Sequence, residues 1–470
     1  MKKVQAALFW IVLLTFWTSA HVFAAQVIQN IPSSGIVLNQ PGTYVFENNI
    51  TWSPTAAGAA ITITANDVIL DMQGHTLKSI PTTFKTIGIL GQSTTDLEIK
   101  NGQVRDMGLN GIQCNKCNNV TIKEVTVDGL NVNDTVNLTA AAGIFVTGCQ
   151  NALALKCVVK NINVETASAS GIQFTSSTPA KAIECQTKNL TNRDGVCSGI
   201  AHTSCIDCVV QSCKIDGITT KFINNNNTSG HTSIGIFPFL STTIKIEDCD
   251  ISNVTGCCDD AHGLSLFICS SCLVKNCKVK NVLDGKGAAK TGAKATGIEV
   301  YASQVLVTDC HVKNIKAINP QDLQAAGFSV ADANDVKFVR CKAENVKVVD
   351  AHGKYEPFLG FGVGFGWAPD PRPLFLVPAT NVLYLNCIAE NCQVGFDTWD
   401  HIDSVWAHIV SKCNDIAILK QPGAERTITC NACSQCGCTQ AGCAPTLLTV
   451  TTPNQAKNNT FLDVKKIKCK

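Results

Sequence analysis

A short pattern of apolar and polar positions recurs along the chain from about Gly88 to Ile409. Each copy begins with glycine, an apolar residue, a polar or aromatic residue and a second apolar residue. It ends with a turn, another apolar run and cysteine. Alternation with a period of two is typical of β-strands, so the pattern predicts a chain of short strands. The glycine and cysteine pairs include Gly143 and Cys157, Gly171 and Cys185, Gly199 and Cys213, Gly235 and Cys249, Gly263 and Cys277, Gly297 and Cys310, and Gly327 and Cys341.

The alternation also predicts which side chains enter a core. The first and third residues after each glycine should point inward and the second outward, which places Ile144 and Val146 inside and Phe145 outside. Asparagine follows most of the cysteines by four residues, and we expect these amides to stack on one another in an enclosed column. The column comprises Asn161, Asn189, Asn253, Asn281, Asn314, Asn345 and Asn391.

Repeats of this kind share one continuous core when they stack, so the repeat region needs no internal domain boundary. The pattern resembles the coils of right-handed parallel β-helix proteins of the pectate-lyase-like superfamily. The opening Pro41-Gly42-Thr43-Tyr44, followed by Val68 to Leu77, also resembles the start of many bacterial β-helix-repeat proteins. The resemblance covers roughly residues 40 to 430. It implies an all-β, single-stranded parallel solenoid of about twelve coils.

The domain organisation that we predict has four parts. Residues 1–24 form a signal peptide, 25–57 an N-terminal cap, 58–429 the parallel β-helix and 430–470 a cysteine-rich C-terminal cap. The superfamily contains lyases, hydrolases, esterases, phage tailspikes and adhesins, so the resemblance does not define a reaction.

The N-terminus predicts export. Lys2 and Lys3 precede the apolar stretch from Ala6 to Trp17, and Val22-Phe23-Ala24 provides a small-residue cleavage site. We therefore expect a secreted, periplasmic or cell-surface protein. No later segment approaches the roughly 20 apolar residues of a membrane helix, so we expect no membrane insertion after cleavage. The formal net charge is +2 and the basic residues are scattered, which argues against nucleic acid as a partner.

The 26 cysteines fall into two groups. Those in the repeat position should form a buried column of free thiols, since parallel strands keep their Cβ atoms about 4.8 Å apart and a disulfide needs them closer. A metal wire and serial disulfides are the alternatives. For the remaining cysteines, a disulfide-locked tail from Cys430 to Cys469 competes with a zinc site. Disulfides between coils are expected at Cys117, Cys149, Cys205, Cys208, Cys257, Cys258, Cys269 and Cys272.

The resemblance implies polysaccharide binding along the outward face of the first strand of each coil. In the N-terminal coils these positions hold Gln113, Phe145, Gln173 and Ala201, which offer no chemistry. The C-terminal coils place an aromatic residue four positions after glycine, and Trp367 lies nearby. Such a strip suits sugar faces, although outward aromatics also act as cover beneath loops. Its members are Phe239, Phe267, Tyr301 and Trp399.

Acidic residues gather in the same region. Asp332, Asp370 and Asp400 follow the first strand of successive coils, where neighbours would lie roughly 5 Å apart and alternate ones roughly 10 Å apart, near the spacings of glycosidase carboxylates. The alternative is that they are solvated turn residues. Arg372 and His401 complete the catalytic candidates. The candidates for substrate binding are Tyr301, Trp367, Trp399, Glu299 and Asp397.

A motif at Asp259-Asp260 and His262-Gly263 is similar to elements of polygalacturonases, but the Asn-Thr-Asp and Arg-Ile-Lys elements of that family are missing. We therefore interpret Asp259 and Asp260 as loop residues, with His262 at the start of a coil. The sequence predicts no metal site or other cofactor, and it does not define an oligomeric state. Two hypotheses follow. The first is a secreted protein that contacts polysaccharide or a cell-surface glycan through a C-terminal groove, either as a hydrolase or lyase or as a binder. The second is a non-catalytic surface or envelope protein with a structural or adhesive role.

Overall fold

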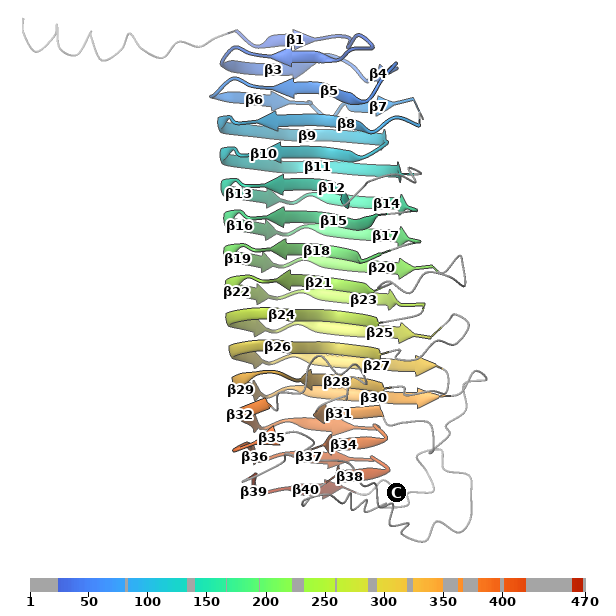
Figure 1. The fold of residues 1–470 in the computed structure, drawn as a ribbon, viewed down its shortest axis with the longest axis vertical. Helices are drawn as coiled ribbons and strands as arrows, with labels where there is room; N and C mark the ends of the chain where they lie inside the picture. The colour runs from blue at the N-terminus through green and yellow to red at the C-terminus, as the bar shows by residue number, and fades with distance from the viewer. Residues whose placement is uncertain are drawn as a thin grey trace, which may run out of the picture.

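The computed structural model is a long stack of coils made of parallel strands (Figure 1). It describes residues 24–80, 83–132, 140–165, 167–193, 195–221, 232–257, 260–285, 294–318, 324–349, 362–366, 379–397, 401–419 and 459–467. All pairings between neighbouring coils in these residues are parallel, and the same residues contain no helix. The predicted all-β parallel solenoid is therefore confirmed. In this part of the chain, no helix is long and apolar enough to cross a membrane.

The first strands of the coils form one continuous parallel sheet, which we call the first-strand face. Its strands are β2 (Ile36–Leu38), β5 (Gly58–Ile63), β8 (Thr86–Gln92), β10 (Asn110–Asn115), β12 (Ala140–Thr147), β15 (Ser168–Thr175), β18 (Cys197–Thr203), β21 (Ser233–Phe239), β24 (Asp260–Lys275), β26 (Lys294–Thr308), β28 (Gln324–Val330), β31 (Gly362–Gly366), β34 (Val394–Asp397) and β38 (Ile416–Leu419). The long strands β24 and β26 continue around the next corner into the second strand of their coils.

The second strands form another sheet. They comprise β1 (Gln26–Ile28), β3 (Gly42–Phe46), β6 (Val68–Asp71), β9 (Thr95–Met107), β11 (Asn118–Val132), β13 (Gln150–Leu155), β16 (Thr178–Ile183), β19 (Ile206–Gln211), β22 (Thr242–Glu247), β29 (Asn334–Val339), β32 (Ala379–Leu385), β35 (His401–Ile402), β36 (Val405–Ala407) and β39 (Thr460–Leu462). Strands β9 and β11 also extend into the third strand of their coils.

The third strands complete each coil. They comprise β4 (Ile50–Trp52), β7 (Thr76–Ser79), β14 (Val158–Val164), β17 (Gln186–Asn192), β20 (Lys214–Thr220), β23 (Asp250–Thr255), β25 (Lys278–Asp284), β27 (His311–Ile318), β30 (Lys342–Val349), β33 (Ile388–Glu390), β37 (Val410–Lys412) and β40 (Lys465–Ile467). The N-terminal strands β1 to β4 already pair with the following coils of this stack. At the C-terminal end, β39 pairs with β36 and β40 pairs with β37.

The glycine of the repeat lies where the backbone leaves no room for a side chain. A β-carbon on Gly143 would lie 2.3 Å from Cγ1 of Val159 and 2.9 Å from the carbonyl oxygen of Gly171. The glycine therefore points inward, and so does the residue that follows it. Ile144 and Val146 are buried and Phe145 is partly exposed, as the alternation predicts. Glycine is required at position 143 because any side chain there would collide with Val159 of the third strand.

The core changes from aliphatic to aromatic toward the C-terminal end. Phe365 stacks on Phe328 at 4.7 Å and on Phe396 at 5.2 Å between ring centroids. A second aromatic column joins Tyr384 to Trp406 at 3.9 Å. These columns form because in-register strands place equivalent side chains directly above one another. The large rings take the register positions that Leu264, Ile298 and Val307 hold in the preceding coils.

The repeat cysteines are buried, and they are free thiols, as predicted. Cys157 donates its S–H to the carbonyl oxygen of Ile122 at 3.3 Å, and Cys185 donates to Ala154 at 3.4 Å. Burial raises the pKa of the Cys387 thiol above its usual range, which keeps it protonated. Cys387 therefore behaves as a small apolar group with one weak donor.

The prediction of disulfides between turn cysteines is wrong for six members of that group. Cys117, Cys149, Cys205, Cys208, Cys269 and Cys272 are free and buried. Several lie at a corner where the thiol turns inward and donates to backbone carbonyl groups, as Cys149 does to Thr147 at 3.4 Å. Cys258 lies outside the described residues. Cys413 is disulfide-bonded, and the tail from Cys430 to Cys469 lies outside the described residues.

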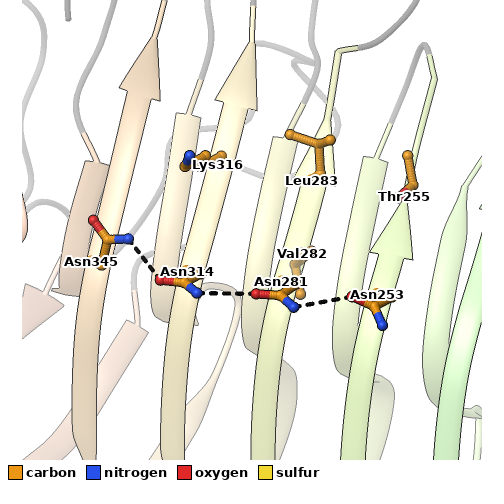
Figure 2. A pocket seen from close by; sticks show the side chains of 8 residues that line it. All are labelled: Asn253, Thr255, Asn281, Val282, Leu283, Asn314, Lys316 and Asn345. Carbon is orange, nitrogen blue, oxygen red and sulfur yellow. Dashed lines mark hydrogen bonds between the residues drawn. The ribbon is translucent and has the colours of Figure 1, made fainter. Parts of the chain in front are cut away.

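The asparagines form the predicted ladder, but on the outside of the rod (Figure 2). Asn345 donates its Nδ2–H to Asn314 at 2.7 Å, Asn314 to Asn281 at 3.0 Å, and Asn281 to Asn253 at 3.0 Å. The expectation of an enclosed column is wrong, because these side chains are exposed or half-buried. Each of these asparagines has a φ between 57° and 59°, and this left-handed bend turns the side chain outward.

Candidate functional site

The outer side of the first-strand face changes character along the rod. Register aligns Gln113, Phe145, Gln173 and Ala201 in the N-terminal half, and the same column continues through Ser265, Glu299 and Ser329. These side chains point away from the core because each follows a core residue such as Ile298. The column reaches Asp397 through β31 and β34, whose Phe365 and Phe396 are paired. Charged groups on this face therefore occur in the C-terminal half, as expected.

Aromatic rings follow one another along this face, two positions beyond that column. Ring centroids of Phe239 and Phe267 lie 5.8 Å apart, and those of Phe267 and Tyr301 lie 5.3 Å apart. Phe237 lies in the column itself, aligned with Ala201, and its ring centroid is 5.8 Å from that of Phe239 on the same strand. We call these four residues the aromatic strip. The first three rings are partly exposed and Tyr301 is buried. The strip predicted at Phe239, Phe267 and Tyr301 thus exists as a contiguous row.

Two apolar turn residues extend the strip at its edge. Leu240 and Ile268 directly follow Phe239 and Phe267, and their side chains are 46% and 53% exposed. Both have left-handed backbones, with φ of 50° and 53°. Equivalent turns of other coils hold polar residues such as Ser176 and Ser204. A β-branched residue in this conformation is unusual and strained, and at position 268 it leaves an apolar side chain exposed at the edge of the strip.

A charged network lies next to Tyr301. It consists of Asp260, His262 and Ser265 on β24 and of Lys294 and Glu299 on β26. Lys294 Nζ lies 2.5 Å from Glu299 Oε1, and Ser265 Oγ donates to Glu299 Oε2 at 2.8 Å. His262 Nδ1 lies 3.4 Å from Glu299 Oε2, and His262 Nε2 lies 3.8 Å from Asp260 Oδ2. All five side chains are buried.

The strip and the network are joined through Lys294. Its Nζ lies 3.4 Å from the Tyr301 hydroxyl and 5.2 Å from the centre of that ring. The cation therefore faces both the carboxylate of Glu299 and the electron-rich face of an aromatic ring. This arrangement holds Tyr301 in position at one end of the strip.

The two central charges of the network are stabilised in their ionised forms. Burial by itself would raise the pKa of Glu299, but the charges of His262 and Lys294 outweigh it and lower that pKa to about 2. Burial alone would lower the pKa of Lys294, and the carboxylate of Glu299 instead keeps it above its usual range. A glycosidase acid needs a carboxyl group with a raised pKa. Glu299 is therefore unsuited to donate a proton, and Lys294 is unsuited to accept one.

The structure places the described catalytic candidates apart. Asp332 lies in the turn after β28, half-buried and with a φ of 45°. His401 lies in the interior, where its Nε2 is 2.9 Å from the Tyr384 hydroxyl and its ring tilts against Trp406. An interior position does not suit a group that must touch a substrate. Asp370, Arg372 and Asp400, together with Trp367 and Trp399, lie outside the described residues.

The substrate-binding candidates that are described lie on one face but not at one point. Glu299 and Tyr301 are neighbours in the same strand. Asp397 is buried in the same column as Glu299 but three coils away, which is roughly 14 Å at the strand spacing. This exceeds the about 6.5–9.5 Å of an inverting carboxylate pair. Glu299 and Asp397 therefore do not form such a pair.

Sequence reasoning missed most of the network. Asp260 was expected in a loop, but it is the first residue of β24, where it pairs with Lys294. The signal was present in the spacing, since Asp260 and Lys294 each lie three residues before a repeat glycine. In the part of the chain that the structure describes, no group of three or more His, Cys, Asp or Glu side chains is arranged to hold a metal ion.

Comparison with known proteins agrees with the architecture. Residues 142–343 match the family model of the right-handed β-helix region. The chain is a right-handed parallel β-helix. No curated protein matches its sequence.

Several solved structures are similar to this β-helix at low sequence identity. The A-module of mannuronan C-5 epimerase AlgE6 from Azotobacter vinelandii is 12% identical, with 92% of each chain covered and a TM-score of 0.34. The family 28 exopolygalacturonase of Yersinia enterocolitica is 9% identical, with 96% of this chain and 73% of that chain covered and a TM-score of 0.38. A tailspike protein of E. coli bacteriophage HK620 is 11% identical, with 90% and 72% covered and a TM-score of 0.43. Likeness of this degree does not transfer an activity.

Proposed function

We propose that this β-helix is an exported, rod-shaped protein that contacts an extended polysaccharide through the aromatic strip. The observation that carries the proposal is the row of Phe237, Phe239, Phe267 and Tyr301 along the first-strand face. Aromatic rings that repeat along a rod can each stack on the apolar face of a sugar, so they suit a polymer of sugar units. The exposed side chains of Leu240 and Ile268 widen this surface.

The proposal is binding rather than cleavage. The central carboxylate of the charged network belongs to Glu299, whose lowered pKa suits a fixed anion and not a proton donor. Lys294 and Glu299 neutralise one another and position Tyr301, so the network supports the strip from beneath. The signal peptide predicted from the sequence agrees with a partner outside the cell or on its surface.

The test is a glycan array probed with the mature chain, followed by titration of the best glycan against two variants. Phe267→Ala removes one central ring and should weaken binding about tenfold, in the range of an aromatic hot spot. Phe84→Ala removes a 39% exposed phenylalanine far from the strip and should leave the affinity unchanged. Circular dichroism checks that both variants keep their strand content. Absence of any bound glycan, or equal losses in both variants, would overturn the proposal.

A further inference from the structure

A second elongated depression lies on the third-strand side of the rod. It has a volume of about 360 Å³ and runs across β23, β25, β27 and β30 (Figure 2). One wall is the asparagine ladder and the other contains Thr255, Leu283 and Lys316. We call it the asparagine groove. Its lining residues are Asn253, Thr255, Asn281, Val282, Leu283, Asn314, Lys316 and Asn345.

The amide wall retains unused hydrogen-bonding capacity. Each side-chain amide has two N–H donors and an oxygen with two lone pairs. In the ladder, Asn281 and Asn314 each use one N–H and one lone pair. The row ends where Asn253 donates to the carboxylate of Asp216 at 2.6 Å, which polarises every bond along it. The remaining donors and acceptors repeat at the strand spacing and suit the hydroxyl groups of an extended sugar chain.

The charges around the groove are mostly positive. Lys316 lines it, and Lys347 continues the same column on the next coil. Neither lysine has an ion pair among the described residues. On the other side of the ladder, Lys280 and Lys313 are aligned with one another, and their ion pairs are with Asp250 and Glu344. No carboxylate lines the groove, so a ligand with negative charges would compensate Lys316 and Lys347.

We propose that the asparagine groove binds an extended anionic polysaccharide, with its hydroxyl groups on the amide row and its carboxylates at Lys316 and Lys347. A polysaccharide is favoured over a single-stranded nucleic acid because no aromatic side chain lines the groove, and such proteins stack bases on aromatic rings. The groove is distinct from the aromatic strip, which lies on the first strands of the coils. The proposal therefore does not depend on binding at the strip.

The experiment is a calorimetric titration of the full mature chain with hexagalacturonate, and with cellohexaose as the uncharged comparison. Hexagalacturonate should bind at low ionic strength and weaken strongly near 1 M salt, where the screening length is about 3 Å. Lys316 is exposed and Lys347 half-buried, and Lys316→Glu and Lys347→Glu should each weaken binding about fivefold, as expected for the reversal of a surface charge. Cellohexaose should bind much more weakly.

Lys181→Glu is the matched control, because it makes the same charge change on β16 at a position aligned with Val209, on the second-strand side. It should leave the affinity for hexagalacturonate unchanged. Phe267→Ala is measured beside it to tell binding in the groove from binding at the aromatic strip. The proposal is overturned if hexagalacturonate does not bind, if Lys181→Glu weakens binding as much as Lys316→Glu, or if oligothymidylate binds at Lys316 more tightly than hexagalacturonate. Loss of binding in Phe267→Ala alone would assign the uronate to the aromatic strip and also overturn the proposal.

Discussion

At the scale of single residues, the bends of each coil depend on side chains that accept a left-handed backbone. The ladder asparagines have φ values near 57°, and their amides bond from coil to coil. Asparagine accepts this conformation more readily than most residues, and its amide supplies one donor and one acceptor to neighbouring coils. Asparagine therefore serves two purposes: it adopts the left-handed bend, and it forms the hydrogen bonds of the ladder.

Asn281 allows these two contributions to be separated. Asn281→Gly keeps a residue that adopts the left-handed bend but removes the two amide hydrogen bonds, so it should cost about 1 kcal/mol of unfolding free energy. Asn281→Ala loses the same bonds and adds about 1–2 kcal/mol of backbone strain. Urea denaturation of both variants measures the difference. Equal losses in the two variants would show that the bend carries no conformational cost.

At the scale of strands, β24 and β26 combine a regular inner side with an unusual outer side. Inward residues such as Leu264 and Ile298 continue the core columns, whereas outward Glu299 and Lys294 are buried charges. A buried ion pair costs desolvation, and it becomes strongly destabilising when one partner is removed. The position of Tyr301 at the end of the aromatic strip depends on this pair.

Removal of one charge from the network should therefore be costly. Glu299→Gln leaves Lys294 buried without its carboxylate and should lower the unfolding free energy by about 3–5 kcal/mol. The double variant Glu299→Leu with Lys294→Met removes both charges and should recover most of the loss. Chemical denaturation measures both. If the double variant were as unstable as the single one, the network would contribute through more than charge pairing.

The same network predicts a dependence of stability on pH. The pKa of Glu299 is lowered to about 2 in the folded chain, compared with about 4.3 for an ordinary glutamate. Its contribution is fully present above about pH 4.3, because the ionised form is the one that folding favours. It is lost as the pH falls from there toward 2. The acid sensitivity of the double variant over this interval should be smaller than that of the unmodified chain.

At the scale of the whole molecule, the rod is a sum of coils that contact only their neighbours. Stability in such a solenoid comes from each unit and its interfaces, so units can be removed without loss of the fold. Register shows the coil period directly, since Ala142 pairs with Ser170 and Ser170 with Ser198. Deletion of residues 171–198 would join Ser170 to Gly199 and preserve every column.

We expect this exact deletion to fold cooperatively, with the strand signal retained in circular dichroism and a melting temperature lowered by only a few degrees. A matched deletion of residues 171–184 removes half of a coil and brings Ser170 against Cys185. It should not fold, because core residues would then be aligned with turn residues. A well-folded half-coil deletion would contradict the column model of stability.

The sequence alone determined the fold of this protein. Glycine and cysteine recur at a near-constant spacing, and parallel strands stack equivalent positions, so the inward columns at Ile144, Ile172 and Leu264 could be predicted. The aromatic strip could be predicted in the same way, from the four-residue offset of Phe239, Phe267 and Tyr301. Local periodicity carries this information because every coil repeats the same short-range constraints.

The tertiary structure decided which side chains point outward at each bend. It also decided which charged side chains of neighbouring coils contact one another. The ladder asparagines were expected to be enclosed, but their left-handed φ turns them to the surface and creates the asparagine groove. Asp260, His262, Lys294 and Glu299 lie on two coils, and their contacts arise from the alignment of β24 with β26. His401 is a catalytic candidate by residue type, but it lies in the interior against Tyr384. These outcomes depend on backbone torsion and on lateral register, which the order of residues within a single coil does not specify.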